Sequence, residues 1–186
     1  REGQGAGMKI LYIYKRFDHH AGYSGYDQIC RHLPSTHYQP GKIFRFLYRR
    51  DPNLFRRVRA IDPEWYNFEN FCLEMELSVR ISLVNRTTFH MLYGENFYRF
   101  LGTAPVRRNN RIVVTFHQPP DVFPRAIERP ACVSRADAIV AVGSSQLDFF
   151  RGLTGRDNVY LVPHGIDTGF FTPPERKAWD GPLRCI

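Results

Sequence analysis

Short apolar runs and amphipathic stretches alternate along this chain, and their spacing predicts strands and helices in turn. The apolar runs predict strands at 9–14, 41–47, 86–94, 111–117, 136–143 and 158–165. The stretches between them predict helices at 26–33, 63–85, 95–102 and 144–153. In the longest helix the apolar positions are spaced like a single face, formed by Phe68, Phe71, Cys72, Met75 and Val79. A broken helix is predicted over 119–135, because Pro124 and Pro130 interrupt that segment.

The predicted strands are continuously apolar rather than alternating, which is typical of a parallel sheet covered on both faces by helices. The order of elements therefore predicts an α/β fold with a doubly wound, Rossmann-like parallel sheet, in one domain of the 186-residue chain. We expect residues 1–7 to be a tag remnant or a disordered tail, and residues 8–166 to form the domain. No apolar stretch reaches the length of about 18 residues that a membrane span needs.

Much of the formal net charge of +8 lies between Lys42 and Arg59. Basic residues in this segment are opposed only by Asp51, and aromatic and aliphatic residues stand between them. Such a segment attracts phosphates, anionic lipid headgroups or nucleic acid, and it is equally consistent with a solvated basic face. The cysteines are scattered without metal-type spacing, which indicates reduced, buried thiols in a cytosolic protein.

Ligands of parallel α/β sheets bind at the carboxyl ends of the strands, so the residues that follow each apolar run form the candidate site. The loop with Ser24 and Gly25 precedes a helix whose free N–H groups suit a phosphate or carboxylate, and Lys15 and Arg16 would add positive charge. His117 directly follows a β-branched run. At this position His117 is predicted either to act as a hydrogen-bonding or acid–base group at the mouth of the cleft, or to be a structural histidine.

The residues near the other strand ends point less clearly to a ligand or a reaction. Ser144 and Ser145 are predicted to cap the next helix, with ligand contact as the alternative. His90 lies inside an apolar run and is predicted to pack within the sheet. The first strand is not followed by GxGxxG, which argues against a nicotinamide-dependent enzyme, and no GxxxxGK[ST] loop or metal-ligand spacing is present.

Four ordered motifs resemble the N-terminal half of family-four glycosyltransferases, which have the two-domain GT-B fold. The "SGYD" stretch at 24–27 stands where the family has Gly-Gly-x-Glu, with Ser24 in place of the first glycine, and residues 115–117 match a Thr-x-His strand end. The "ADAIVAVGSS" stretch at 136–145 resembles the family's ADxIIAVS strand. The "LVPHGIDTGFFTP" stretch at 161–173 resembles its VIPNGVD hinge, with His164 where asparagine is commonest. These motifs extend over nearly the whole chain from Met8.

The resemblance implies a retaining, metal-independent glycosyltransferase of the hexosyltransferase type, active in glycan biosynthesis. It would move a sugar from a UDP- or GDP-linked donor to a hydroxyl of a sugar, lipid or small-molecule acceptor, without a cofactor. The reaction centre would contain His117, and the donor phosphates would be approached by Ser24, Gly25, Lys15, Arg16 and Ser144. The hinge would contain His164, Gly165 and Asp167. Residues 167–186 would then lead into a donor-binding domain absent from this chain, so these residues alone are expected to be inactive.

The basic segment falls where relatives that glycosylate lipids have a membrane-facing surface. By resemblance, a membrane or acceptor surface would be formed by Arg45, Arg49, Arg50, Arg56, Arg57 and Arg59. The protein would be cytoplasmic and peripheral at the inner membrane face. The alternative is a non-catalytic module that binds anionic surfaces, either membrane or nucleic acid, through residues 42–59. No nucleic acid partner is expected, because the sequence has no nucleic-acid-binding signature. A non-catalytic relative that keeps the fold is a further alternative.

Overall fold

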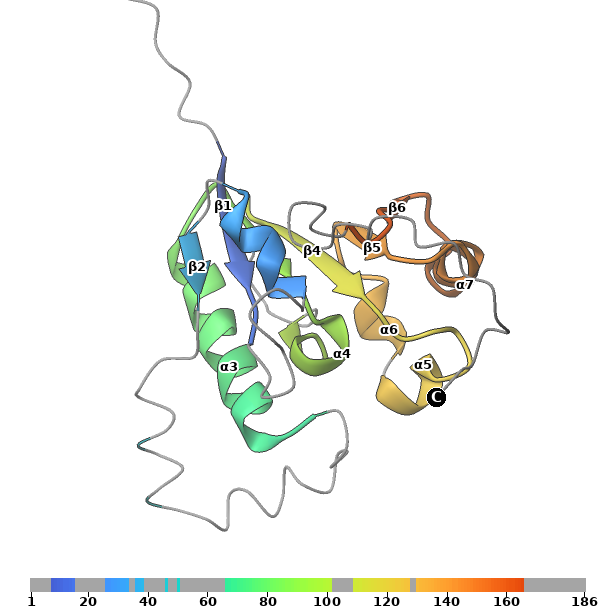
Figure 1. The fold of residues 1–186 in the computed structure, drawn as a ribbon. Coiled ribbons are helices and arrows are strands. Elements are labelled where there is room, and N and C mark those ends of the chain that lie inside the picture. Colours follow the sequence, from blue (N-terminus) through green and yellow to red (C-terminus); the bar gives the residue numbers. More distant parts are fainter. Residues whose placement is uncertain are drawn as a thin grey trace, which may run out of the picture.

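The computed structural model describes residues 8–15, 26–33, 36–38, 46, 50, 66–101, 109–127 and 130–165. These residues form an α/β fold around a six-stranded sheet in which every pairing is parallel. Its strands lie in the order β2-β1-β3-β4-β5-β6 (Figure 1). In chain order the strands are β1 (Lys9–Ile13), β2 (Thr36–Tyr38), β3 (Thr87–Met91), β4 (Arg111–Phe116), β5 (Ala138–Ala141) and β6 (Val159–Leu161).

Helices connect the strands. They are the 3-10 helix η1 (Tyr26–Arg31) and the α-helices α3 (Phe68–Leu83), α4 (Gly94–Phe97), α5 (Phe123–Ala126), α6 (Pro130–Val133) and α7 (Ser144–Thr154). The predicted interruption of the segment at 119–135 is confirmed, since it forms two four-residue helices. Pro124 lies in the first turn of α5 and Pro130 is the first residue of α6, positions where a missing N–H breaks no helical hydrogen bond.

The second strand differs from the prediction. It is formed by 36–38 rather than 41–47. Of the predicted range the structure describes only Phe46, which is helical and exposed. The apolar residues Ile43, Phe44, Phe46 and Leu47 also fit helical spacing, and short apolar runs do not distinguish the two periods.

The strand order reverses direction once, between β1 and β3. The chain passes from β1 to β2 on one side, and β3 then pairs with the other side of β1. The carboxyl ends of β1 and β3 are therefore the switch point of the sheet, the place where doubly wound sheets bind ligands. The two strands stay paired up to this point, because the Leu92 N–H donates to the carbonyl of Ile13 at 2.9 Å.

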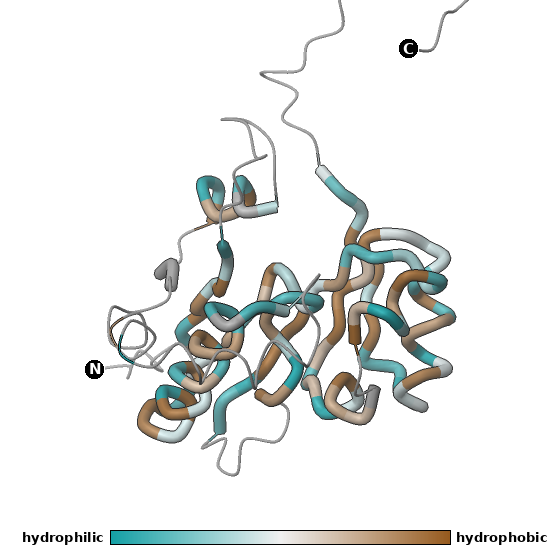
Figure 2. The backbone as a smooth tube through the Cα atoms, turned by 90° about the horizontal axis from the view of Figure 1, so that it is seen from below, coloured by the Kyte–Doolittle hydropathy of each residue, from teal (hydrophilic) through white to brown (hydrophobic). Residues whose placement is uncertain are grey.

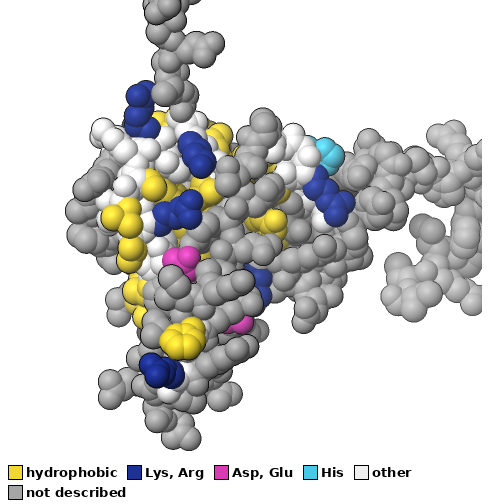
Figure 3. Space-filling view, turned by 90° about the vertical axis from the view of Figure 1, so that its left-hand side faces the viewer, with side chains coloured by type: hydrophobic (Ala, Val, Ile, Leu, Met, Phe, Trp, Pro, Cys, Tyr) yellow, Lys and Arg dark blue, Asp and Glu magenta, His cyan; other side chains and the backbone are white. Residues whose placement is uncertain are grey.

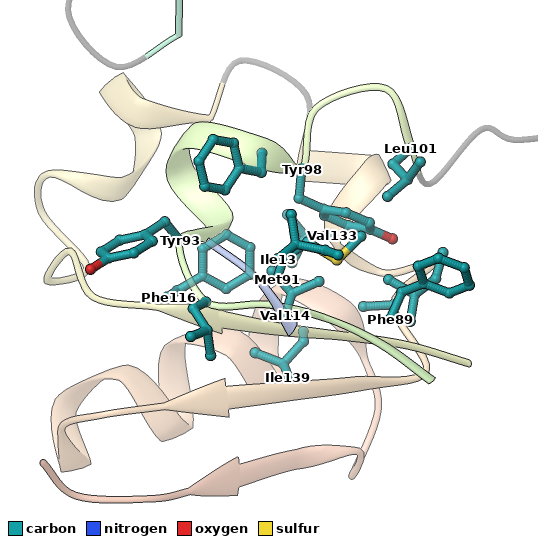
Figure 4. Packing of buried hydrophobic residues seen from close by; sticks show 14 of the residues in the cluster. Ile13, Phe89, Met91, Tyr93, Tyr98, Leu101, Val114, Phe116, Val133 and Ile139 are labelled. Atoms are coloured by element: carbon teal, nitrogen blue, oxygen red, sulfur yellow. The ribbon is translucent and has the colours of Figure 1, made fainter. Parts of the chain in front are cut away.

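One face of the sheet is covered by the helices that pack on it (Figure 4). In register across the strands, Ile13, Met91 and Val114 are all 0% exposed. The hydrophobic stretches of the backbone run along these strands inside the molecule (Figure 2). The side chains that alternate with them are less buried, as at His90 and Val140. Full burial of both faces is therefore not observed in the described residues.

The helices cover one face more fully than the other because of the handedness of the connections between the strands. From β2 to β6 every crossover advances in the same direction across the sheet, and right-handed crossovers then lie on one face. Two side-chain contacts confirm that α5 and α7 share this face, because the ring of Phe116 lies 5.2 Å from that of Phe123 and 5.0 Å from that of Phe150. Only the β1-to-β2 crossover, which contains η1, runs in the opposite direction.

Helix α3 buries a different face from the one predicted. Its fully buried side chains are Leu73, Leu77 and Ile81, whereas Val79 is 58% exposed. Of the other predicted positions that the structure describes, Cys72 is buried and Phe71 and Met75 are half-buried. The buried stripe also includes Asn70 and Glu74. A prediction that assigns every polar residue to the exposed face of a helix therefore misses this stripe.

Three thiols, those of Cys30, Cys72 and Cys132, are buried and form no disulfide. Burial raises the pKa of the Cys72 thiol to about 11, with the carboxylates of Glu69 and Glu76 adding to the shift. The Cys72 thiol is therefore neutral, and all three buried cysteines contribute to the packing. Within the described part of the chain no helix combines the length and apolar character needed to cross a membrane.

Gly94 is required where α4 packs on β4. A Cβ at this position would lie 2.5 Å from Val114 Cγ1 and 2.5 Å from Phe116 Cε1, and both side chains belong to the sealed core. We predict that Gly94→Ala destabilises the fold by about 1–3 kcal/mol through overpacking, measured by chemical denaturation. Gly152→Ala in α7 is the matched control, because a Cβ there meets nothing within 4 Å. Equal stability of Gly94→Ala and the wild type would contradict the proposed packing.

Candidate functional site

Four aromatic side chains meet at the carboxyl ends of the strands. Tyr93 follows β3, His117 follows β4, His164 lies beyond β6, and Tyr26 begins η1. The Tyr26 ring stacks on both imidazoles, with its centroid 3.5 Å from that of His117 and 4.1 Å from that of His164. Tyr93 lies 5.6 Å from Tyr26 and 5.4 Å from His117. Chain segments far apart in sequence therefore converge at this edge of the sheet, and we name these four residues the strand-end cluster.

The backbone at His117 is held by a buried carboxylate. Glu95, on α4, is 2% exposed, and its Oε1 accepts the backbone N–H of His117 at 2.5 Å and that of Gln118 at 2.8 Å. Its Oε2 lies 3.7 Å from Nδ1 of the His117 imidazole. Because β4 ends at Phe116, these N–H groups belong to no strand pairing. Glu95 thus supplies the acceptors that the end of the strand lacks.

A second buried polar side chain holds the same turn from the opposite side. The Gln146 amide nitrogen donates to the carbonyl of Phe116 at 3.2 Å and to that of Gln118 at 2.7 Å. Its amide oxygen accepts the backbone N–H groups of Val142 and Gly143, just beyond β5. Gln146 therefore ties the carboxyl ends of β4 and β5 together, and the turn at His117 is fixed by both neighbouring elements.

The imidazole of His117 is buried, with a side-chain exposure of 7%. Neither of its ring nitrogens has a hydrogen-bond partner among the described residues. Unsatisfied buried polar atoms are rare in native proteins, and a role in catalysis or in binding a ligand is one explanation for them. The position can bind a hydroxyl or transfer a proton.

Burial and nearby charge affect the other members of the strand-end cluster. The pKa of the Tyr26 hydroxyl is raised by burial and by the Glu95 carboxylate, so the phenol stays neutral. The pKa of His164 is lowered by burial and by its neighbour His117. Glu95 is the acidic side chain that faces Tyr26 and His117 among the described residues.

The predicted donor-phosphate residues are only partly described. Arg16, Ser24 and Gly25 lie outside the described residues. Lys15 forms a 2.8 Å ion pair with Glu69 of α3. Ser144 is exposed and is the first residue of α7. The prediction that Ser144 caps this helix is wrong, because Gly143 is the N-cap and its N–H is bound by Gln146.

The predicted hinge and membrane surface are likewise described in part. His164 and Gly165 are both exposed beyond β6, and Asp167 lies outside the described residues. Arg50 is exposed, with its guanidinium carbon 5.6 Å from the centroid of the Phe46 ring. On the face drawn in Figure 3 the described Lys and Arg side chains stand apart from one another. The remaining predicted surface residues, outside the described part, are Arg45, Arg49, Arg56, Arg57 and Arg59.

A second buried carboxylate supports α4 from the other end. Glu74 of α3 is fully buried, and its Oε1 accepts the consecutive N–H groups of Arg99, Phe100 and Leu101 at 2.6–3.1 Å. Its Oε2 accepts the hydroxyl of Tyr66. Burial raises the pKa of Glu74, although these hydrogen bonds act in the opposite direction. Glu74, Glu95 and Gln146 were not predicted, and the only sequence signal for them is a polar residue inside an otherwise apolar segment.

Metal ligands are not gathered anywhere in the described part of the chain, where no group of three His, Cys, Asp or Glu side chains could hold an ion. The polar groups that the structure describes beside the aromatic rings of the strand-end cluster are the imidazoles of His117 and His164 and the carboxylate of Glu95. No protein-family model matches the chain, and no curated protein matches it either.

His90 shows how a structural histidine differs from His117. Its Nε2 lies 2.8 Å from the Thr115 hydroxyl, and its ring lies 5.2 Å from that of Tyr12. Burial lowers the pKa of His90 to about 4. The prediction that His90 packs within the sheet is confirmed.

The lowered pKa of His90 predicts an acid-sensitive contribution to stability. Between pH 6.5 and about 4 the unfolded chain protonates His90 while the folded chain does not, so stability falls as the pH falls through this window. We expect the loss to reach about 3 kcal/mol relative to His90→Gln, which cannot titrate. Urea denaturation of both proteins from pH 7 to pH 4 measures it. Parallel pH profiles for the two proteins would contradict the buried neutral imidazole.

Proposed function

We propose that the chain is the N-terminal, acceptor-side domain of a retaining glycosyltransferase of the GT-B type, similar to family four. The described residues support this proposal in three ways. The sheet is parallel with a switch point between β1 and β3, His117 lies at the carboxyl end of β4, and His164 and Gly165 follow β6. The Thr115–His117 motif and the described part of the 161–173 motif thus lie at the ends of strands.

The observation that carries the proposal is the buried, unsatisfied imidazole of His117 within the strand-end cluster. Small-molecule sites are lined mainly by aromatic and apolar side chains, with a few fixed polar groups that orient the ligand. Tyr26, Tyr93 and His164 supply the aromatic lining, and His117 supplies the polar group. This composition suits a sugar, which has both hydroxyl groups and apolar faces.

In the proposed reaction, the bond between the anomeric carbon and the leaving diphosphate oxygen breaks. A new bond forms between that carbon and the acceptor hydroxyl oxygen, and the hydroxyl proton leaves with the released nucleotide. His117 would hydrogen-bond a sugar or acceptor hydroxyl and hold it at the reacting centre. The donor-phosphate role of Ser24 and Gly25, the UDP or GDP donor and the acceptor classes remain predictions. So does a location at the inner membrane face.

The alternative of an anionic-surface module depends on residues 42–59. Of its arginines the structure describes Arg50 alone, whereas the residues that favour glycosyl transfer lie at the carboxyl ends of the strands. We therefore keep glycosyl transfer as the proposed function.

The test is turnover of nucleotide sugars by the protein expressed from its complete gene. UDP- and GDP-linked sugars are offered with sugar, lipid and small-molecule acceptors in the presence of EDTA, and released nucleotide is quantified. We predict metal-independent transfer with retention, and a loss of about a hundredfold or more in kcat/KM for His117→Ala, because a positioned acid–base or hydrogen-bonding group is removed.

The matched control is His32→Ala. His32 is an exposed histidine that follows η1, and we expect this variant to keep the wild-type rate. Two results would contradict the proposal: no donor is consumed with any acceptor class, or His117→Ala turns over as fast as His32→Ala.

A further inference from the structure

We propose that Glu95 is the positioning residue for His117, because it holds the backbone that carries the imidazole and lies beside one of the two ring nitrogens. A single carboxylate contacts both the backbone and the ring. Its Oε1 holds the N–H groups of His117 and Gln118, and its Oε2 lies 3.7 Å from the ring Nδ1 of His117.

The backbone contacts fix the direction of the His117 side chain. Two N–H groups converge on the same carboxylate oxygen, at 2.5 Å and 2.8 Å, so the chain turns tightly around it directly after β4. The carbonyl of Gln118 is held in turn by Gln146 at 2.7 Å. With the residue after His117 anchored at both its N–H and its carbonyl, the turn has little freedom to swing the imidazole away.

The second carboxylate oxygen determines which nitrogen carries the proton. The side chains of His117 and Glu95 are 7% and 3% exposed, so little water separates them, and their interaction is weakly screened. A carboxylate beside Nδ1 favours the neutral tautomer with the proton on Nδ1. The lone pair is then on Nε2, which can accept a hydrogen bond from a hydroxyl.

The other groups around the ring do not produce this preference. Tyr26 and His164 contact the imidazole by stacking, with ring planes tilted by 20° and 7°, and Tyr93 approaches it at 43°. Burial raises the pKa of Tyr26 and lowers that of His164, so both rings are uncharged around neutral pH. Glu95 is therefore the group that distinguishes the two nitrogens among the described residues.

Glu74 provides an internal comparison. It is likewise a buried glutamate whose Oε1 binds consecutive backbone N–H groups, here those of Arg99, Phe100 and Leu101. Its second oxygen meets the hydroxyl of Tyr66 instead of an imidazole. Glu74→Gln therefore disturbs a similar structural element and leaves the carboxylate beside His117 unchanged.

The experiment measures the tautomer of His117 in the full chain by NMR of 15N-labelled histidine side chains. Spectra are taken at alkaline pH, where the imidazole is neutral, and His117→Asn assigns the signals. We expect the wild type to favour the Nδ1–H form by about tenfold or more, because a charged acceptor strengthens such contacts. Glu95→Gln should abolish the preference, Glu95→Asp should restore part of it, and Glu74→Gln should leave it at the wild-type value.

A wild-type His117 that carries its proton on Nε2 would overturn the proposal, and this result does not depend on whether any variant folds. An unchanged tautomer ratio in folded Glu95→Gln, or an equal change in Glu74→Gln, would also overturn it. The benefit to substrate binding rests on the proposed function, whereas the NMR readout requires no substrate. Failure of glycosyl transfer and failure of this positioning role are therefore distinguishable.

Discussion

The arrangement of the site depends on one interaction, in which the buried carboxylate of Glu95 accepts the two N–H groups directly beyond the fourth strand. A strand that ends inside a protein leaves donors without sheet partners, and buried donors without partners destabilise the fold. Glu95 satisfies the N–H groups of His117 and Gln118 from α4. In doing so it holds the imidazole of His117 at the edge of the sheet where α/β folds bind ligands.

This interaction in turn depends on packing and on two further polar contacts. Gly94 lets α4 approach Val114 and Phe116 closely enough for Glu95 to reach the strand end. Glu74 binds the N–H groups of 99–101 just beyond α4, and Gln146 binds the carbonyls of Phe116 and Gln118 from α7. A four-residue helix has little stability of its own, so α4 owes its position to these contacts.

The sequence predicted the strands at Lys9–Ile13, Thr87–Met91, Arg111–Phe116 and Ala138–Ala141, because each lies in a short apolar run that alternates with a helical stretch along the chain. It also predicted the exit of His117 from β4. It could not predict the polar contacts, since Glu74, Glu95 and Gln146 look like solvent-facing residues until the crossovers bring backbone donors to them. The wrong face of α3 follows from the same assumption that polar residues lie outside, whereas the wrong cap at Ser144 follows from the preference of serine for N-cap positions.

Hydrogen exchange at the amides of His117 and Gln118 tests the central role of Glu95 most directly. Both residues follow the last residue of β4, so sheet pairing cannot protect them. The carboxylate contact predicts exchange slower than the rate of an unprotected amide by about a hundredfold or more, because exchange requires local opening of the buried turn. Exchange of both amides near the unprotected rate would show that Glu95 does not hold this turn, and would contradict the account of the site.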